Sequence, residues 1–258
     1  MTSNAEKFTW QSVLEGREIT PPVFTFRLTR DDAFRFTAGQ FARLGVTGTD
    51  GEVVWRAYSM VSSPYDEFLE FFSVVVPDGA FTQPLSNIQV GDQLRVDRQA
   101  FGFLTLDRFV DGRDLWLLAT GTGLAPYLSI LQDFEVWERF ERIVLVYSVR
   151  TEQELAYQAL IRELPLREHV QAHGHKLTYV PIVTREPVAG ALSQRLTDVI
   201  SNGTLEQAAN LALTPEHSRI MLCGNPQMID EVRGLLKQRD LQLSLSRRPG
   251  QVAVETYW

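Results

Sequence analysis

The sequence predicts two units in one chain: an antiparallel β-barrel over residues 1–106, followed by an α/β unit with a parallel sheet over residues 107–258. Three observations predict this fold. Apolar residues recur at a spacing of two from Phe8 to about Val96, which is the spacing of β-strands. Strand and helix patterns alternate from Asp114 onward, as they do in parallel sheets. A chain of 258 residues is also long enough for two ordinary domains.

The first unit consists of short apolar runs separated by turn residues. Segments such as Pro21-Pro22 and Thr49-Asp50-Gly51 mark the breaks between these runs. The expected strands lie at residues 23–28, 40–46, 53–60, 69–76 and 93–96, with a short helix at 84–88. Because several short strands follow one another without long helices between them, we expect an antiparallel barrel.

The second unit alternates strands with helices, and its boundary with the first unit falls near residues 106–113. The expected strands lie at 115–119, 143–148, 177–183 and 219–223, and the expected helices at 124–132, 154–164, 194–200 and 227–238. This alternation predicts a parallel sheet joined by right-handed crossovers.

Composition excludes several classes of protein. The chain carries 25 Lys and Arg against 32 Asp and Glu, a net charge of −7, which disfavours binding to nucleic acid or to an anionic membrane. No apolar run approaches the roughly 20 residues of a membrane span, and the first residues lack the pattern of a signal peptide. Its single cysteine permits neither an internal disulfide nor a four-cysteine iron–sulfur cluster. We therefore expect a cytoplasmic protein, and a monomer.

The segment 115–130, LWLLATGTGLAPYLSI, predicts a phosphate-binding turn. A strand, a Gly-rich turn and a helix start are the arrangement that presents backbone N–H groups to a phosphate. Pro126 stands where the usual dinucleotide fingerprint has its third glycine. Proline fits the first helical turn, where its missing N–H would have no partner.

The end of the next expected strand bears on which dinucleotide binds. NAD-dependent enzymes of this architecture place Asp or Glu there to hold the ribose 2′-hydroxyl. Here Val149 and Arg150 follow the strand, and no carboxylate stands immediately after it. This pattern favours NADPH over NADH.

Five motifs occur in a fixed order along the chain. They are Arg56-Ala57-Tyr58-Ser59, the strand FFSVVV at 71–76, the turn PDGAFT at 77–82, ATGTGLAP at 119–126, and CGNPQM at 223–228. In this order they resemble the ferredoxin–NADP⁺ reductase family over nearly the whole chain. The resemblance implies an FAD-binding barrel at 1–106 and an NADP(H)-binding unit at 107–258. It also implies hydride transfer between NADPH and FAD, and single-electron transfer between FAD and ferredoxin or flavodoxin.

The resemblance implies a set of FAD-binding residues. Arg56 offers a planar fork of donors suited to phosphate oxygens, Tyr58 an aromatic face for the flavin, and Ser59 a hydroxyl for flavin N5. The remaining expected FAD contacts are Ala57, Phe72, Ser73, Val74, Ala80, Phe81, Thr82 and Thr122.

The resemblance also implies residues on the nicotinamide side. Arg150, Arg185 and Arg195 match positions that contact the 2′-phosphate in bacterial members. Cys223 would lie beside the nicotinamide as a compact side chain rather than a nucleophile. Gly224, Asn225 and Pro226 form the turn that follows it.

The chain ends in Glu255-Thr256-Tyr257-Trp258. In bacterial members with this Tyr-Trp ending, the tyrosine stacks over the flavin and the extra aromatic packs on the FAD adenine. We expect Tyr257 and Trp258 to act in this way, and Tyr257 to move aside for the nicotinamide, so that its motion limits turnover in part. The expected catalytic residues are Ser59, Cys223, Glu255 and Tyr257.

Two other functions remain open from the sequence. The same scaffold also serves flavin or quinone reductases, and a non-catalytic redox sensor could bind both nucleotides. An acidic ferredoxin needs a local cluster of Arg on this acidic chain, for which Arg43, Arg56, Arg247 and Arg248 are candidates. No metal site is expected, because His169, His173 and His175 lie in a polar segment without a cysteine partner.

Overall fold

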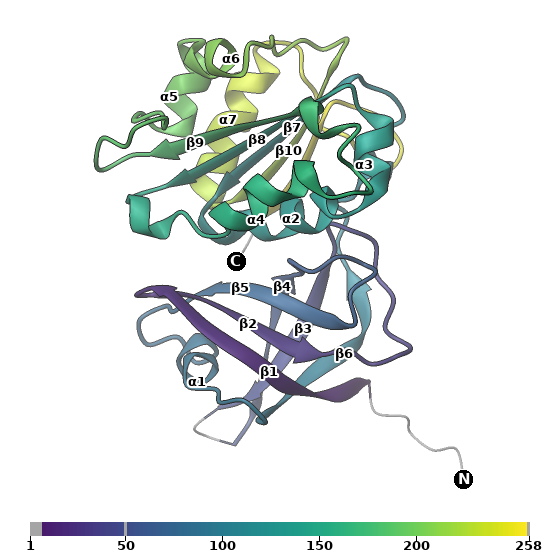
Figure 1. Cartoon of the computed structure of the whole chain (residues 1–258), viewed down its shortest axis with the longest axis vertical. Helices are drawn as coiled ribbons and strands as arrows, with labels where there is room; N and C mark the ends of the chain where they lie inside the picture. The colour runs from purple at the N-terminus through teal and green to yellow at the C-terminus, as the bar shows by residue number, and fades with distance from the viewer. Residues whose placement is uncertain (1–6, 49–50, 257–258) are drawn as a thin grey trace.

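The first unit of the computed structural model, which describes residues 7–48 and 51–256, is a six-stranded antiparallel sheet (Figure 1). Its strands are β1 (Phe8–Thr20), β2 (Val23–Thr29), β3 (Phe41–Thr47), β4 (Val53–Ser59), β5 (Phe68–Val74) and β6 (Gln93–Phe101). They pair in the order β4-β3-β6-β1-β2-β5, which leaves β4 and β5 at the two ends of the sheet.

The two end strands curl round until they meet, which closes the sheet into a barrel. A bridge joins Met60, just after β4, to Phe71 in β5, and the rings of Tyr58 and Phe71 lie edge-on at 6.3 Å. Buried residues such as Phe26, Leu44 and Phe71 fill the interior. The short helix α1 (Thr82–Ser86) adds its buried Leu85 to this core.

The second unit is a five-stranded parallel sheet covered by helices on both faces (Figure 1). Its strands are β7 (Asp114–Thr120), β8 (Arg142–Val149), β9 (Leu177–Val183), β10 (Ser218–Gly224) and β11 (Val252–Thr256), in the order β11-β10-β7-β8-β9. The helices α2 (Ala125–Leu131), α3 (Phe134–Arg139) and α4 (Gln158–Glu163) cover one face, and α5 (Leu196–Ser201), α6 (Thr204–Ala209) and α7 (Pro226–Lys237) the other. The predicted fold class is confirmed in both units.

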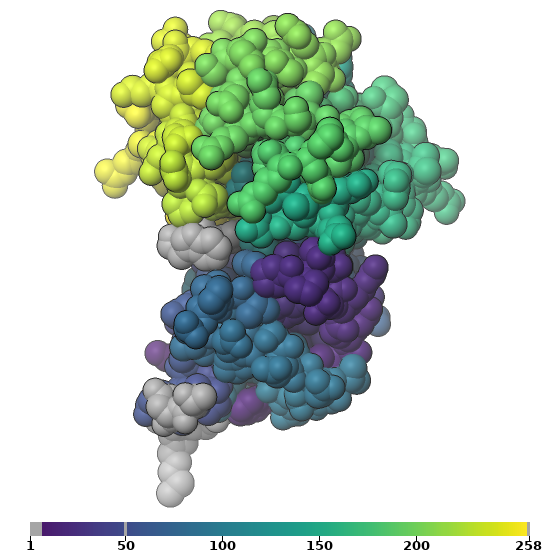
Figure 2. All heavy atoms as spheres, turned by 90° about the vertical axis from the view of Figure 1, so that its left-hand side faces the viewer, coloured from purple at the N-terminus to yellow at the C-terminus, as the bar shows by residue number. Residues whose placement is uncertain are grey.

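Alternate residues of β7 enter two different cores. Trp116 and Leu118 pack with α5, α6 and α7, whereas Leu117 packs with α2, α3 and α4. The core that contains Leu117 continues into the barrel, because Val61 and Phe72 of the first unit belong to the same buried cluster. The two units therefore share one apolar core across their junction, and Figure 2 shows them stacked in direct contact.

Several elements differ from the prediction. The helix expected to start at residue 154 begins at Gln158, because Tyr157 has a φ of 58° that interrupts the helical path after the 3₁₀ turn η3 (Glu152–Glu154). The sequence patterns did not identify β1, β11, α3 or α6 as separate elements. Among these, β11 matters most, since it pairs in parallel with β10 and carries Glu255 toward the barrel.

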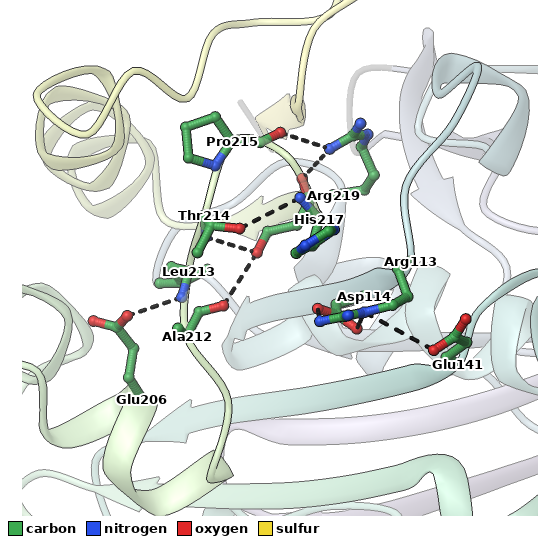
Figure 3. A network of polar contacts seen from close by, with 11 residues as sticks. Arg113, Asp114, Glu141, Glu206, Ala212, Leu213, Thr214, Pro215, His217 and Arg219 are labelled. Atoms are coloured by element: carbon green, nitrogen blue, oxygen red, sulfur yellow. Dashed lines mark hydrogen bonds and ion pairs between the residues drawn. The ribbon is translucent and has the colours of Figure 1, made fainter.

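A polar network holds the edge of the parallel sheet at which its strands begin (Figure 3). Asp114 is fully buried at the start of β7, where Arg113 holds its carboxylate with two hydrogen bonds of 3.0 Å. The backbone N–H groups of both residues donate to the carbonyl of His217, and Arg219 pairs with Asp111. These contacts fix β7 beside β10 and leave the opposite edge, where the strands end, available for a ligand.

Candidate active site

A cavity of about 440 Å³ opens on the barrel side of the junction. Its lining includes Arg56, Ala57, Tyr58, Ser59, Phe72, Ser73, Val74, Ala80, Phe81, Thr82, Thr122 and Thr256. All the residues that the sequence assigned to the flavin within the described part of the chain therefore lie around one cavity. They come from three segments of the barrel and from the Gly-rich turn of the second unit.

Tyr58 is fixed at the base of this cavity by contacts on both sides. Its hydroxyl lies 3.0 Å from Ser73 Oγ, and its ring stacks on Phe81 with centroids 5.4 Å apart. Burial raises the pKa of Tyr58, so the phenol stays neutral. Arg56 lies on the exposed rim, where its guanidinium donates to the carbonyl of Trp55 at 2.8 Å and keeps further donors available.

Ser59 and Glu255 meet across the junction. Ser59 Oγ donates to Glu255 Oε1 at 3.0 Å, which joins the end of β4 to the end of β11. Burial raises the pKa of Glu255 to about 7, although the hydrogen bond from Ser59 opposes that shift. A carboxyl group with this pKa exchanges its proton near neutral pH, beside the hydroxyl assigned to flavin N5.

A second cavity, of about 430 Å³, lies where the strands of the parallel sheet end. It is lined by Val23, Phe72, Val74, Thr120, Gly121, Thr122, Tyr147, Ser148, Val149, Arg150, Glu154, Thr184, Gly224 and Asn225. This is the position at which open α/β sheets bind their ligands. Phe72, Val74 and Thr122 line both cavities, so the two cavities adjoin along a shared wall of side chains.

Close packing requires glycine at one position of the Gly-rich turn and at one position of the turn after β10. The turn forms the 3₁₀ segment η2 (Gly121–Leu124), and a Cβ on Gly123 would overlap the carbonyl of Cys223. Gly224 has a φ of 131°, and a Cβ there would collide with Thr120. As expected, Pro126 occupies the first turn of α2.

The turn after β10 starts a well-capped helix. The side chain of Asn225 accepts a hydrogen bond from the Met228 N–H at 3.2 Å, and Pro226 takes the first position of α7. Thr120 Oγ1 accepts from the Asn225 N–H at 2.9 Å. Gly224 and Asn225 line the second cavity, whereas Cys223 before them is fully buried and lines neither.

The three arginines assigned to the 2′-phosphate differ in their surroundings. Arg150 Nη2 lies 2.6 Å from Glu154 Oε1, and the Arg150 N–H donates to the other oxygen at 3.0 Å. Burial acts to raise the pKa of Glu154, but the hydrogen bonds from Arg150 outweigh it and hold the pKa below its usual value. Sequence analysis missed this pair, although a spacing of four between Arg and Glu is a signal for it.

Arg185 and Arg195 are exposed, and their side chains make no hydrogen bond or ion pair with the part of the chain that the structure describes. Arg185 follows β9, where its backbone N–H donates to the Arg150 carbonyl at 2.9 Å, and Arg195 precedes α5. Neither lines a cavity, and the same holds for Pro226. Tyr257 and Trp258 lie outside the described residues.

The described residues contain neither a cluster suited to a metal ion nor a helix suited to crossing a membrane. Within residues 7–48 and 51–256, no group of three or more His, Cys, Asp or Glu side chains is placed to hold a metal ion. In the same ranges, no helix has the length and apolar character that crossing a bilayer requires.

A barrel cavity that shares one wall with a ligand site at the ends of a parallel sheet defines the class of two-domain oxidoreductases that bind a flavin and a pyridine nucleotide. Residues 18–99 match the family described as oxidoreductase FAD-binding domain, and residues 117–234 match the oxidoreductase NAD-binding domain.

Relatives that match over nearly the whole chain identify the family within this class of oxidoreductases. The chain is 42% identical over 251 residues to ferredoxin–NADP reductase A of Sorangium cellulosum, covering 96% of this chain and 89% of the relative. It is 44% identical over 224 residues to the flavodoxin/ferredoxin–NADP reductase of Escherichia coli K12, covering 86% and 88%. The chain belongs to the ferredoxin–NADP reductase family.

A solved structure agrees with this assignment. The ferredoxin NADP⁺ reductase from Neisseria gonorrhoeae, with bound FAD and NADP, superposes with a TM-score of 0.90 at 38% identity, over 97% of this chain and 98% of that one. A flavohemoglobin from Malassezia yamatoensis, at 19% identity and a TM-score of 0.78, shares the fold over 97% of this chain and 60% of its own.

Proposed function

We propose that this chain is a ferredoxin/flavodoxin–NADP⁺ reductase, which transfers hydride between NADPH and FAD, and single electrons between FAD and ferredoxin or flavodoxin. The observation that carries the proposal is the wall shared by the two cavities, formed by Phe72, Val74 and Thr122. Nucleotides bound in the two cavities would meet at this shared wall, where their reactive rings can come into direct contact, and such positioning is the main contribution of a protein to hydride transfer.

The residues of the first cavity fit FAD, which when bound supplies the hydride acceptor and releases electrons singly. Arg56 has guanidinium donors available at the rim for the diphosphate, together with the turn at Ala80, Phe81 and Thr82. The remaining barrel residues would surround the flavin ring: Ala57, Tyr58, Ser59, Phe72, Ser73 and Val74. Thr122 would contact the ring from the second unit.

The Ser59–Glu255 pair would manage a proton at the flavin edge. Ser59 Oγ carries a hydrogen that it gives to Glu255 in this structure. With FAD bound, the same hydroxyl can donate to N5 while Glu255 takes up or releases a proton. A Glu255 pKa of about 7 suits that exchange at neutral pH.

The residues of the second cavity fit NADP(H). Backbone N–H groups of η2 and the turn at Gly224, Asn225 and Pro226 can hold the nucleotide, with Cys223 packed behind them. Arg185 and Arg195 offer exposed guanidinium groups to the 2′-phosphate. Arg150 would join them by exchanging Glu154 for the phosphate.

Three finer assignments complete the proposal. We place the domain boundary at 106/107, supported by the matched ranges 18–99 and 117–234 on either side of it. We assign Tyr257 to cover the flavin and Trp258 to pack on the adenine, supported by the position of Glu255 two residues before Tyr257. We also propose a cytoplasmic monomer, supported by the single cysteine.

Anaerobic stopped-flow reduction of the FAD-loaded protein tests the function. NADPH should bleach the flavin absorbance faster than NADH does, and a reduced flavin should then reduce an added ferredoxin. Oxidised flavin that persists under NADPH would instead indicate a redox sensor. Efficient reduction of free flavins or quinones without transfer to ferredoxin or flavodoxin would indicate the other alternative.

The same assay tests the nucleotide preference. Arg185→Gln should raise the KM for NADPH by about tenfold, the equivalent of one charge-assisted contact of about 1.4 kcal/mol, and leave that for NADH unchanged. Arg142→Gln is the matched control, because Arg142 starts β8 at the opposite edge of the sheet. Equal effects of the two substitutions would contradict the assignment.

A further inference from the structure

A buried carboxylate lies between the two units, away from the cavity residues of the barrel. Glu70 is 8% exposed, and it is paired with Arg27 on the neighbouring strand at 2.9 Å from Nε to Oε2. It stands two residues before Phe72 in β5, so both side chains point to the same face of the strand. Phe72 belongs to the apolar core shared with the second unit, whereas Glu70 lines a cavity beside it together with Arg27, Tyr157 and Arg162. A carboxylate that is buried there needs specific partners.

The partner is Tyr157, from the second unit. Its hydroxyl donates to Glu70 Oε1 at 2.8 Å. Burial, followed by the charge of Glu70, raises the pKa of Tyr157 well above its usual value, so the phenol remains a donor. We call the hydrogen-bonded pair of Glu70 and Tyr157 the interdomain clasp.

The backbone conformation of Tyr157 is unfavourable for a residue with a side chain, which indicates that its contacts hold it in place. Its φ of 58° and ψ of 20° lie in the left-handed region, which disfavours a side chain and which glycine adopts at lower cost. An aromatic residue kept in that conformation is held by its surroundings, and such positions concentrate at functional sites. Figure 2 shows the teal segment that contains η3 resting on the purple barrel strand, where η3 contacts β1.

The clasp is connected to the wall between the cavities. The ring of Tyr157 packs edge-on against Phe72, with centroids 5.4 Å apart and planes at 85°. Phe72 lines both cavities and is 4% exposed. A shift of Tyr157 would therefore disturb a side chain that lines both cavities at the place where the two rings would meet.

We propose that the interdomain clasp of Glu70 and Tyr157 is a positioning device for hydride transfer, which sets the distance between the nicotinamide and the flavin by fixing Phe72 and the angle between the units. This inference rests on the proposed function. Neither residue touches a nucleotide; the clasp acts through Phe72. Misplacing the rings by a fraction of an ångström lowers the hydride-transfer rate and leaves the nucleotide contacts in place.

The test is Tyr157→Phe in the FAD-loaded protein, with Tyr179→Phe as its matched control. Tyr179 is also a partly buried tyrosine of the second unit, but its hydroxyl accepts from Gln158 within that unit at 2.8 Å. Stopped-flow reduction at saturating NADPH should slow by roughly tenfold in Tyr157→Phe and stay within twofold of the unsubstituted protein in Tyr179→Phe. The KM for NADPH and the rate of flavin reduction by dithionite should be unchanged in both.

Glu70 supplies a second, independent variant. Glu70→Ala removes the acceptor and should reproduce the slow hydride transfer, whereas Glu70→Gln keeps an oxygen for Tyr157 and should retain most of the rate. Normal hydride transfer in both Tyr157→Phe and Glu70→Ala, with only a lower unfolding midpoint, would overturn the clasp. Failure of NADPH to reduce the unsubstituted protein would instead overturn the proposed function.

Discussion

Glu255 shows how one residue can connect stability, pH and the site. Burial raises its pKa from 4.5 in the unfolded chain to about 7, so the folded state binds a proton more tightly than the unfolded state. The stability that this group contributes is complete below about pH 4.5, and it is lost as the pH rises through 7. Desolvation of the charged form is therefore a cost that the folded protein bears at neutral pH in order to keep a proton donor beside Ser59.

Glu255→Gln should remove this dependence. Between pH 5 and pH 8 the unsubstituted protein should lose about 2.5 kcal/mol of unfolding free energy relative to the variant, because this range covers most of the shift from 4.5 to about 7, which in full corresponds to about 3.4 kcal/mol. Urea unfolding at both pH values measures it. Glu216→Gln, at an exposed position, should parallel the unsubstituted protein, and parallel curves for all three proteins would exclude a buried, titrating Glu255.

At the scale of elements, the close packing of η2 against β10 depends on a missing side chain. Gly123→Ala would place a Cβ onto the Cys223 carbonyl and push the Gly-rich turn away from β10. We expect a loss of about 2–4 kcal/mol of unfolding free energy and weaker NADP(H) binding. Denaturant unfolding and nucleotide titration measure the two effects.

Gly234 provides the control for that substitution. It lies within α7 and has open space around the position of a Cβ. Gly234→Ala should therefore raise the unfolding free energy by about 0.5–1 kcal/mol, since alanine favours a helix over glycine. A stabilising effect at both positions would show that the turn has room for a side chain.

Periodicity predicted most strands to within two residues, because burial of one or both faces of a strand leaves a direct trace in the order of residues. The start of α4 was wrong, because the left-handed conformation of Tyr157 is set by a contact with Glu70, 87 residues away. The short strand β11 was missed for a related reason. Its five residues are too few to show a clear apolar period, and they form a strand because they pair with β10. The motifs identified both Ser59 and Glu255, but their hydrogen bond depends on the packing of the two units.

At the scale of the whole molecule, this acidic chain has two exposed arginines in the turn at 245–248, which we call the basic patch. Arg108 lies over the ring of Phe103, which is 76% exposed, and donates to the Ser244 carbonyl at 2.9 Å. The turn at 245–248 follows, with Arg247 and Arg248 exposed. Two of the four arginines expected to attract an acidic carrier thus lie in this turn, and Arg248 also lines a cavity with Arg233 and Lys237 of α7.

The other two arginines are placed differently. Arg43 lies 3.9 Å from Asp97 and over the ring of Trp55, and Arg56 lines the barrel cavity. Arg43 is therefore partly neutralised, and Arg56 is committed to the flavin side in the proposed function. The basic patch with Arg247 and Arg248 is therefore the better candidate for binding an acidic carrier.

Arg248→Glu should lower the rate of electron transfer to an acidic ferredoxin by on the order of tenfold at low salt, and the loss should fade as salt rises. Flavin reduction by NADPH should be unaffected. Arg17→Glu, a charge-matched change on the exposed part of β1, should leave the ferredoxin rate unchanged. Equal losses in both variants would assign the effect to net charge instead of to the patch.

The wall formed by Phe72, Val74 and Thr122 restricts how the two nucleotide sites can evolve. A substitution in this wall that reshapes the binding site of one nucleotide also reshapes that of the other, because the same residues line both cavities. Selection for a different nucleotide donor would therefore alter the flavin site at the same time, so that the two sites would change together. Residues that line only one cavity, such as Arg56 in the first and Arg150 in the second, are where specificity for one nucleotide can change without altering the site of the other.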